Sequence, residues 1–418
     1  MEGLVKDSGL LMCHPALSSQ SARLCPQNLP VENLPAIAKG ARMNITEHLS
    51  ISIGTRPAGD ENDLKAAEYI AETMKSLGLS VEMQPFTFLG WQPERPASVE
   101  LRFPERRTIP AGSFLFSGST PPGGVEGRLV PAGTMYLCRD IFEWPKYAVK
   151  AEDGSDLGYL VANTGGRAIN FVLYELGRLF GRAPYVVIDL PSHEYFQERL
   201  TGGEEIRVWM DISGSVQDGM RTQNVIGTLP GATLGNEEVV VCAHYDTTLD
   251  SPGACDNASG VDAILRIARD LAGGPRPAKT IRFIAFGAEE YLLFGSRYYV
   301  STLKEKGALD RIKNVINLDM VGFGDHLQIT VAPETCKRRI HEVFSGMKDR
   351  IRCEYDANVL PISDHYPFYE EGIPVVMFLG WPYDDYHQST DSYDKIDPDM
   401  VQKTADAAAA AVRHFAGL

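Results

Sequence analysis

The chain has 418 residues and a formal net charge of −15, with 44% hydrophobic and 23% charged residues. These values are ordinary for a globular protein. The sequence lacks a sustained apolar run of the length that spans a bilayer, and it lacks a basic face that would replace the counterions of phosphates. We therefore expect neither a membrane nor a nucleic acid as a partner, and the length predicts several domains or one large domain with an insertion.

Residues 1–42 contain several prolines and no regular pattern, which predicts a disordered N-terminal extension or a start assigned too far upstream. They lack a basic region followed by an apolar core, so we expect no signal peptide. The seven cysteines include no CxxC pair, which argues against a disulfide framework and favours a reducing, cytoplasmic location. Secretion is the alternative if the true start differs. The sequence gives no indication of the oligomeric state.

The first regular element is a helix from about residue 60 to 77. Its expected apolar face comprises Leu64, Ala67, Ile70, Ala71, Met74 and Leu77. Gly78 ends the helix and a strand follows. Residues 97–219 differ in composition and hydrophobic pattern, with short β-type runs, many glycines, and helical patches near 168–180 and 193–201. This change predicts a β-rich insertion at 97–219 within a domain formed by 43–96 and 220–418.

From residue 223 onward, strands and helices alternate. The runs "EVVVCAH", "TIRFIAF", "NVINLD", "LQITVA" and "IPVVMFLG" are almost continuously apolar, as strands covered on both faces should be. Helices are predicted at 261–271 and 398–415. The pattern predicts a doubly wound α/β domain. Ligands of such sheets bind beyond the carboxyl ends of the strands.

Ionisable residues cluster at that predicted edge. They follow the strands or flank the last one, and they are His244, Glu289, Glu290, Asp319, the stretch Ser363–His365, and His387, with Asp256 in a turn before a helix. Each one alone has an ordinary explanation: a loop histidine, a solvated Glu-Glu pair at a helix start, or an aspartate capping a helix. The whole set, in order along the chain, indicates a metal site.

A catalytic zinc requires imidazole and carboxylate ligands, and a pair of metals requires a shared carboxylate. We assign His244 and Asp319 to one ion and Glu290 and His387 to the other, with Asp256 between the two. Glu289 then lies unligated beside the metals, where a general base belongs. The side chain of Asp246, two residues beyond His244, is expected to accept the proton of the ring nitrogen that binds no metal.

These stretches resemble the family of co-catalytic zinc exopeptidases that includes bacterial leucyl aminopeptidases, aminopeptidase Y and glutamate carboxypeptidase II. The matching motifs are "GTRPAGDENDLKAAEYI", "NVIGTLPG", "AHYDTTLDSPGACDNASGV", "FGAEEYLLFGSRYYV", "NLDMVG", "SDHYPFYEEGIPVVMF" and "YHQSTDSYDKID". The resemblance implies the three-layer α/β zinc-exopeptidase fold with a mixed, mostly parallel twisted sheet. It implies two Zn²⁺ per subunit on the same ligands, with Glu289 as base. It also implies that the Tyr386 hydroxyl donates to the oxyanion.

A fainter resemblance covers residues 97–219. The stretches "GRLVPAG", "AVKAEDGSDLGYLVANTGG" and "APYVVIDLPSHEYFQERL" are similar to a protease-associated insert. The resemblance implies a domain that roofs the catalytic face and influences substrate access. The alternative is a family-specific inserted segment that does not have the protease-associated fold.

We expect a zinc-dependent exopeptidase acting on peptides, and favour an aminopeptidase because no Arg/Lys cluster near the motifs suggests a clamp for a C-terminal carboxylate. Arg297, Lys395 or the insert would be the source of such a clamp. The alternatives are a carboxypeptidase of the glutamate carboxypeptidase II type and a glutaminyl-cyclase-like transferase with one zinc. Zinc amidohydrolases with a dimerisation domain carry it after the Glu-Glu pair, whereas the insertion here precedes His244. A scaffold protein without metals would not keep the whole ligand set.

Overall fold

The computed structural model describes residues 44–138, 141–172, 183–345 and 352–418. The predicted extension 1–42 and part of the predicted helical patch 168–180 lie outside these ranges. In the described part of that patch, residues 168–170 form no helix and Phe171–Val172 form the short strand β7. Over those residues the helix prediction is wrong, because Phe171 and Val172 pair with another strand instead of forming a local helical turn.

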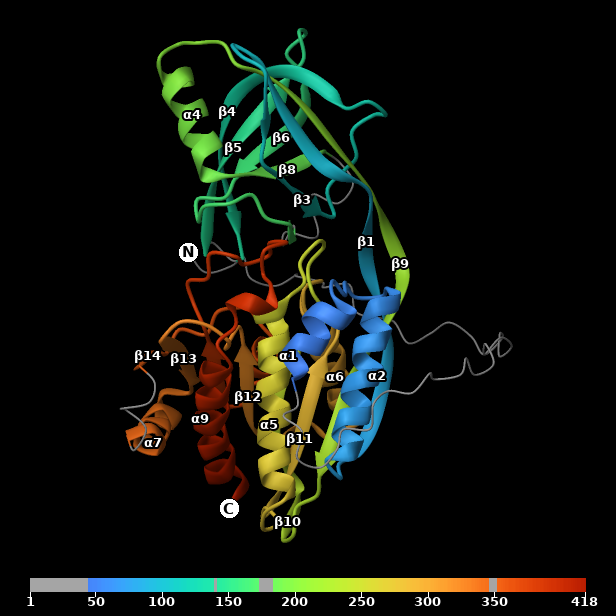
Figure 1. Ribbon diagram of the computed structural model, residues 1–418, viewed down its shortest axis with the longest axis vertical. Helices are drawn as coiled ribbons and strands as arrows, with labels where there is room; N and C mark the ends of the chain where they lie inside the picture. The colour runs from blue at the N-terminus through green and yellow to red at the C-terminus, as the bar shows by residue number, and fades with distance from the viewer. Residues whose placement is uncertain (1–43, 139–140, 173–182, 346–351) are drawn as a thin grey trace, which may run out of the picture. The chain divides into compact units, whose positions relative to one another are not determined.

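A mixed sheet carries the C-terminal half of the chain (Figure 1). Its strand order is β14-β13-β15-β12-β10-β11-β9. The bounds of these strands are β9 Arg207–Leu229, β10 Leu234–His244, β11 Lys279–Phe286, β12 Ile312–Asp319, β13 His326–Ala332, β14 Arg352–Asp356 and β15 Val375–Leu379. The central four, β15, β12, β10 and β11, are parallel, while β13 and β9 pair antiparallel to their neighbours in this group. The predicted mixed, mostly parallel sheet is confirmed.

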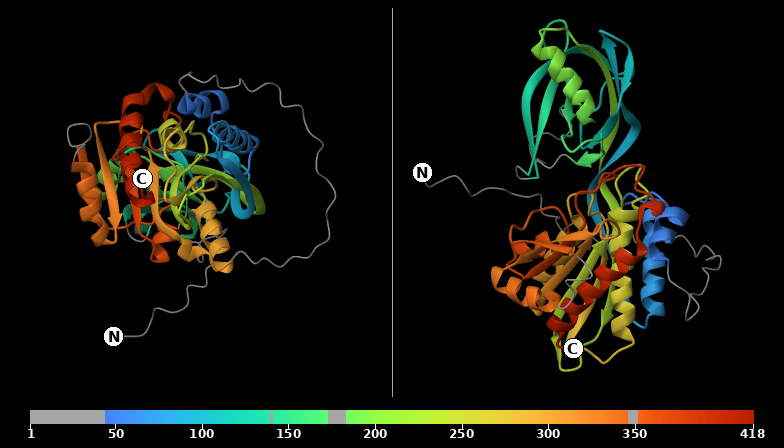
Figure 2. Two further views of the ribbon diagram at one scale, coloured as in Figure 1. Left: turned by 90° about the horizontal axis from the view of Figure 1, so that it is seen from below. Right: turned by 60° about the vertical axis from the view of Figure 1, so that its left-hand side comes forward.

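Helices cover both faces of this sheet. Their bounds are α1 Ile45–Glu47, α2 Glu61–Ser76, α5 Gly260–Ala272, α6 Phe294–Glu305, α7 Glu334–Ser345, α8 Tyr366–Glu370 and α9 Pro398–Ala416. In Figure 1, α2, α5 and α9 lie in front of the strands, and the view from below in Figure 2 places α6 on the opposite side. The apolar strands are therefore buried between two layers, which explains their continuous apolar sequences.

Local chemistry sets the helix ends. The Asp60 side chain accepts a hydrogen bond from the backbone N–H of Asp63 at 2.7 Å and caps α2. The predicted apolar face of α2 is largely buried, but Leu64 is 45% exposed and Asp63 is buried instead. The Asp63 carboxylate accepts hydrogen bonds from the Thr222 hydroxyl and the Gly59 N–H. The buried face of α2 therefore includes a polar residue that is bonded to Thr222, which an apolar periodicity does not predict. Within the described ranges, no helix has the length and apolar character needed to cross a bilayer.

The segment predicted as an insertion is continuous with the main sheet. Strand β1 (Ser80–Phe103) pairs antiparallel with β9 along almost its whole length, and β9 continues the order through β4, β5, β6, β8, β3 and β7. The remaining elements are β2 Arg107–Ile109, β3 Ala111–Leu115, β4 Val125–Leu137, β5 Phe142–Lys150, β6 Asp156–Ala162, β8 Tyr185–Ile188 and α4 Leu190–Thr201. The predicted helix at 193–201 is thus part of α4. The assignment of 97–219 as a protease-associated domain stays a prediction.

Candidate metal centre

The carboxyl ends of the parallel strands lie level at one edge of the sheet. His244, the last residue of β10, is paired in register with Phe286 at the end of β11. Asp319 ends β12 and is paired with Leu379 at the end of β15. The segments that follow β10, β11 and β15 carry the other predicted residues, so strand register brings distant parts of the chain to one place.

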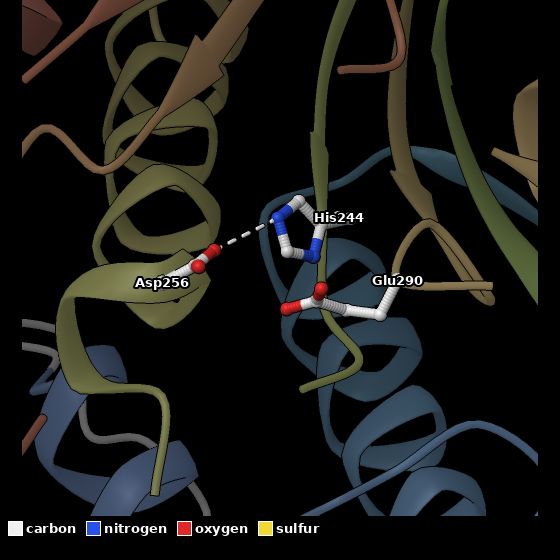
Figure 3. A group of neighbouring side chains, drawn as sticks. All are labelled: His244, Asp256 and Glu290. Carbon is white, nitrogen blue, oxygen red and sulfur yellow. Dashed lines mark ion pairs between the residues drawn. The ribbon is translucent and has the colours of Figure 1, made fainter. Parts of the chain in front are cut away.

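The Asp256 carboxylate lies between the two histidines. Its Oδ1 is 3.1 Å from His244 Nε2 and its Oδ2 is 3.5 Å from His387 Nε2. On the outer sides, Asp319 Oδ1 is 3.5 Å from His244 Nε2, and Glu290 Oε2 is 3.2 Å from His387 Nε2. Figure 3 shows His244 directed at Asp256, with Glu290 beside them. Each oxygen of Asp256 thus faces one histidine, and each histidine has a second carboxylate on its outer side. This is the arrangement expected when one carboxylate is shared by two sets of ligands.

The adjacent glutamates take different positions. Glu290 lies near His387, whereas Glu289 Oε2 is 4.0 Å from His244 Nε2. Two groups of side chains in the described chain have the spacing of metal ligands: His244, Asp256 and Glu290 in one, and His244, Glu289 and Asp319 in the other. By this spacing Glu289 qualifies as a ligand as well as a base, so the division of roles between the two glutamates stays a prediction.

The electrostatics of the cluster favour a cation. Burial raises the pKa of Glu289 and of Glu290, because their charged forms lose the stabilisation given by water. Burial by itself lowers the pKa of His244, but the charges of Glu289 and Asp319 raise it well above its usual value. The oxygens Glu290 Oε1 and Asp319 Oδ1 are buried without a hydrogen-bond donor. Buried anionic oxygens of this kind are paired or coordinate metals, so this donor set fits zinc.

Asp246 has a partner that the sequence did not predict. Its Oδ1 and Oδ2 accept hydrogen bonds from the backbone N–H groups of Glu289 at 3.1 Å and Glu290 at 3.2 Å. The Nδ1 of His244 lies 3.2 Å from the backbone oxygen of Asp246 and 3.7 Å from its carboxylate. The backbone carbonyl is therefore the nearer acceptor for the ring, while the carboxylate holds the Glu289–Glu290 backbone in place.

Other residues hold the predicted ligands. The Asp391 carboxylate accepts from the N–H groups of Cys255 and Asp256 at 2.8 and 3.0 Å. The Ser363 hydroxyl donates to Asp319 Oδ2 at 2.6 Å. Both lie in motifs that were recognised from the sequence, but their roles depend on contacts across the fold. His365 is fully buried, and burial lowers its pKa to about 4, so it is a neutral residue behind the site.

Arg56 is a structural anchor beneath the cluster. It is fully buried, and its guanidinium donates to the backbone oxygens of Leu49, Gly54, Tyr245, Pro252 and Gly253. Burial lowers its pKa to about 10 although the neighbouring carboxylates oppose that change. The arginine therefore ties the loop after His244 to the turn that carries Asp256. Arg56 lies in the motif "GTRPAG", which contributed to the family resemblance, but the sequence did not indicate what this arginine does.

A cavity of about 230 Å³ opens onto the cluster. Its described lining includes all the predicted metal ligands, together with Glu289 and Tyr386, and a set of apolar side chains: Cys138, Ile141, Phe142, Phe171, Val172, Leu292, Leu293, Met320, Leu360, Pro361, Ile362, Leu379 and Trp381. The Tyr386 ring stacks on His387 with centroids 3.7 Å apart. Burial, and then the charges of Asp256 and Glu290, raise the Tyr386 pKa well above its usual value, so the hydroxyl keeps its proton.

Buried carboxylates and imidazoles at the carboxyl edge of an α/β sheet, facing a cavity, are typical of metal-dependent hydrolases. The model of Peptidase family M28 matches residues 224–412. Aminopeptidase YwaD of Bacillus subtilis is 30% identical over 404 residues, covering 91% of this chain and 85% of the relative. The chain therefore belongs to Peptidase family M28, and the resemblance to zinc exopeptidases is confirmed.

Solved structures agree with this assignment. BSAP, a zinc aminopeptidase from Bacillus subtilis, superimposes with a TM-score of 0.67 at 25% identity, covering 89% of this chain and 93% of that chain. A Peptidase M28 precursor from Shewanella amazonensis has a TM-score of 0.72 at 20% identity, covering 88% and 91%. Each match spans most of both chains, which supports the α/β fold class with its large mixed sheet.

Proposed function

We propose that this protein is a zinc-dependent aminopeptidase that removes the N-terminal residue of peptides with two Zn²⁺ per subunit. The observation that carries the proposal is the Asp256 carboxylate, whose two oxygens face His244 and His387 separately. His244 and Asp319 would hold one ion, and Glu290 and His387 the other. Relatives of this chain are named aminopeptidases, which supports the choice of reaction.

Zinc held by these ligands would lower the pKa of a water molecule toward ~7 and polarise the substrate carbonyl. Glu289 takes the proton of the attacking water and later delivers it to the leaving amine. The buried, protonated Tyr386 hydroxyl donates a hydrogen bond to the developing oxyanion. Asp246 holds the backbone of Glu289 so that its carboxylate stays directed into the cavity.

The charges around the cavity favour an N-terminal substrate. Its described lining contains acidic side chains and no lysine or arginine, which suits a substrate ammonium group and offers no clamp for a terminal carboxylate. Arg297 and Lys395 are outside this lining and pair with Glu370 and Asp385. Aminoacyl p-nitroanilides and their N-acetylated forms provide the test, together with zinc analysis. We expect about two zincs, as a shared carboxylate requires, and activity on free amines alone.

Loss of zinc is expected to abolish this activity. Dialysis against a chelator should give an inactive protein, and stepwise addition of zinc should restore turnover, because the carboxylates alone cannot activate water. Protein with two zincs and no hydrolysis of any free-amine substrate would contradict the proposed function. One zinc together with cyclase activity on N-terminal glutamine would support the transferase alternative.

The apolar lining predicts a preference for apolar N-terminal side chains. Ile362 is half-buried in the cavity wall. Ile362→Asp should lower kcat/KM for a leucyl substrate by about 10–200-fold, the range for mismatches in an apolar pocket, and should lower it less for a lysyl substrate. Ile51→Asp is the control, since Ile51 is 61% exposed and is not part of the described lining. Equal losses for both substrates would place Ile362 away from the bound side chain.

A further inference from the structure

The loop of residues 167–170, which lies in the predicted insertion, contacts the segment that carries His387. The backbone oxygen of Asn170 lies 2.9 Å from His387 Nδ1. A carbonyl oxygen only accepts hydrogen bonds, so this contact places the ring proton on Nδ1. Nε2, which faces Glu290 and Asp256, is then left with its lone pair directed into the cluster. The partners of metal-ligating histidines fix the tautomer and the ring orientation in this way.

The equivalent contact of the other histidine is local. His244 Nδ1 lies 3.2 Å from the backbone oxygen of Asp246, two residues further along the chain. The partner of His387 instead precedes it by 217 residues. The two halves of the cluster therefore differ: one histidine is oriented by its own loop, and the other depends on the predicted insertion.

The Asn170 side chain fixes the position of its own carbonyl. Its Oδ1 accepts from the backbone N–H of Ser113 in β3 at 2.9 Å. Its Nδ2 donates to the backbone oxygen of Leu249 at 2.6 Å, in the loop between β10 and Asp256. Asn170 thus joins a strand of the predicted insertion to the metal-bearing part of the chain.

Neighbouring contacts hold the same two segments together. Gln388 Nε2 donates to the backbone oxygen of Ala168 at 2.8 Å, and Arg167 Nη1 donates to Asp385 Oδ1 at 3.1 Å. Gly112 allows β3 to lie close against the loop of residues 167–170, because a Cβ at Gly112 would lie 2.0 Å from the backbone oxygen of Ile169.

The backbone of His387 requires such support. Its φ of 55° lies in the left-handed region, which non-glycine residues adopt at a cost and keep when the surrounding structure determines it. Bonds from the loop reach His387 itself and the residues on both sides of it, Asp385 and Gln388. The loop therefore constrains both the backbone and the ring of this ligand.

From these contacts we propose that Asn170 is a positioning residue for the zinc ligand His387, and that the predicted insertion completes one of the two metal sites as well as forming part of the cavity wall. The proposal rests on the proposed function, because it assumes that His387 binds zinc. The proposal has a consequence for the predicted insertion as a whole, whose deletion, by the resemblance stated above, would change substrate access. Such a deletion removes Asn170, so it would also impair the metal site.

The test is Asn170→Ala, compared with the wild type and with Asn358→Ala, which removes an exposed asparagine outside the cluster. Zinc affinity is measured by competition with a chromophoric chelator, and kcat and KM are measured with stoichiometric and with excess zinc. The variant keeps the backbone carbonyl but removes the two side-chain bonds that fix its position. We therefore expect one zinc to bind as in the wild type and the other about 10–100-fold more weakly, the range found when the partner of a metal ligand is disturbed. The value of kcat should fall at stoichiometric zinc and recover with excess zinc, with a smaller change in KM.

A purely structural role for Asn170 predicts a different result. The melting temperature would fall, but the folded variant would bind both zincs with wild-type affinity, and that outcome would overturn the proposal. If Asn170→Ala does not fold, Gln388→Ala decides, since it removes one bond between the same segments; unchanged affinity for both zincs in that variant would equally overturn it. Failure of the proposed function is distinguishable, because the wild type itself would then lack zinc or peptidase activity.

Discussion

Glu289→Gln is expected to fold, to retain its zinc and to lose at least ~10²-fold in kcat, the lower end of the effect of removing a general base. Glutamine keeps the size and the hydrogen-bonding capacity of glutamate but cannot take a proton from water. The backbone N–H of Glu289 still donates to Asp246 Oδ1, so the loop should keep its position. Circular dichroism and zinc analysis accompany the kinetics.

The matched control is the neighbouring residue. Glu290→Gln replaces an anionic oxygen 3.2 Å from His387 Nε2 with a neutral group. It should weaken or lose one zinc, and excess zinc should partly restore activity because metal affinity is then the limiting defect. If Glu289→Gln loses zinc while Glu290→Gln holds both ions, the two roles are reversed. That outcome deserves measurement because Glu289 also has ligand spacing with His244 and Asp319.

Tyr386→Phe is expected to lower kcat by about 10²–10³-fold, the usual cost of losing an oxyanion donor. The ring and its stacking on His387 remain, so zinc content should not change. The value of KM should change much less, because the hydroxyl acts mainly in the transition state.

Tyr369→Phe provides the comparison, since Tyr369 is 41% exposed in α8 and lies outside the described cavity lining. It should retain wild-type kinetics. A fall in kcat of less than about threefold for Tyr386→Phe would assign Tyr386 to packing against His387 and Trp381, since a contact without a role in the transition state contributes little to ΔΔG‡.

The insertion illustrates the limit of sequence reasoning about whole segments. The sequence shows the change in composition and pattern at 97–219, and it shows the alternation of strands and helices that follows. The sequence did not predict the length of β1 and β9, which join the two parts into one continuous sheet. Each of these strands pairs with a partner more than a hundred residues away, and such pairing leaves no local pattern. The burial of Asp63 in α2 has the same origin, because its carboxylate accepts a hydrogen bond from Thr222, 159 residues further along the chain.

The sequence by itself determined the fold class and the members of the candidate site. Apolar runs covered on both faces predict parallel strands, and residues that follow such strands meet at one edge, so the sequence alone predicts that His244, Asp319 and His387 lie together. Tertiary structure alone decided how these side chains are held. The carbonyl of Asn170, the carboxylate of Asp391 and the hydroxyl of Ser363 reach them from distant segments. Hydrogen bonds of this kind leave no periodic pattern in a sequence, because they depend on distance and direction in the folded chain and any polar residue or backbone group can supply them.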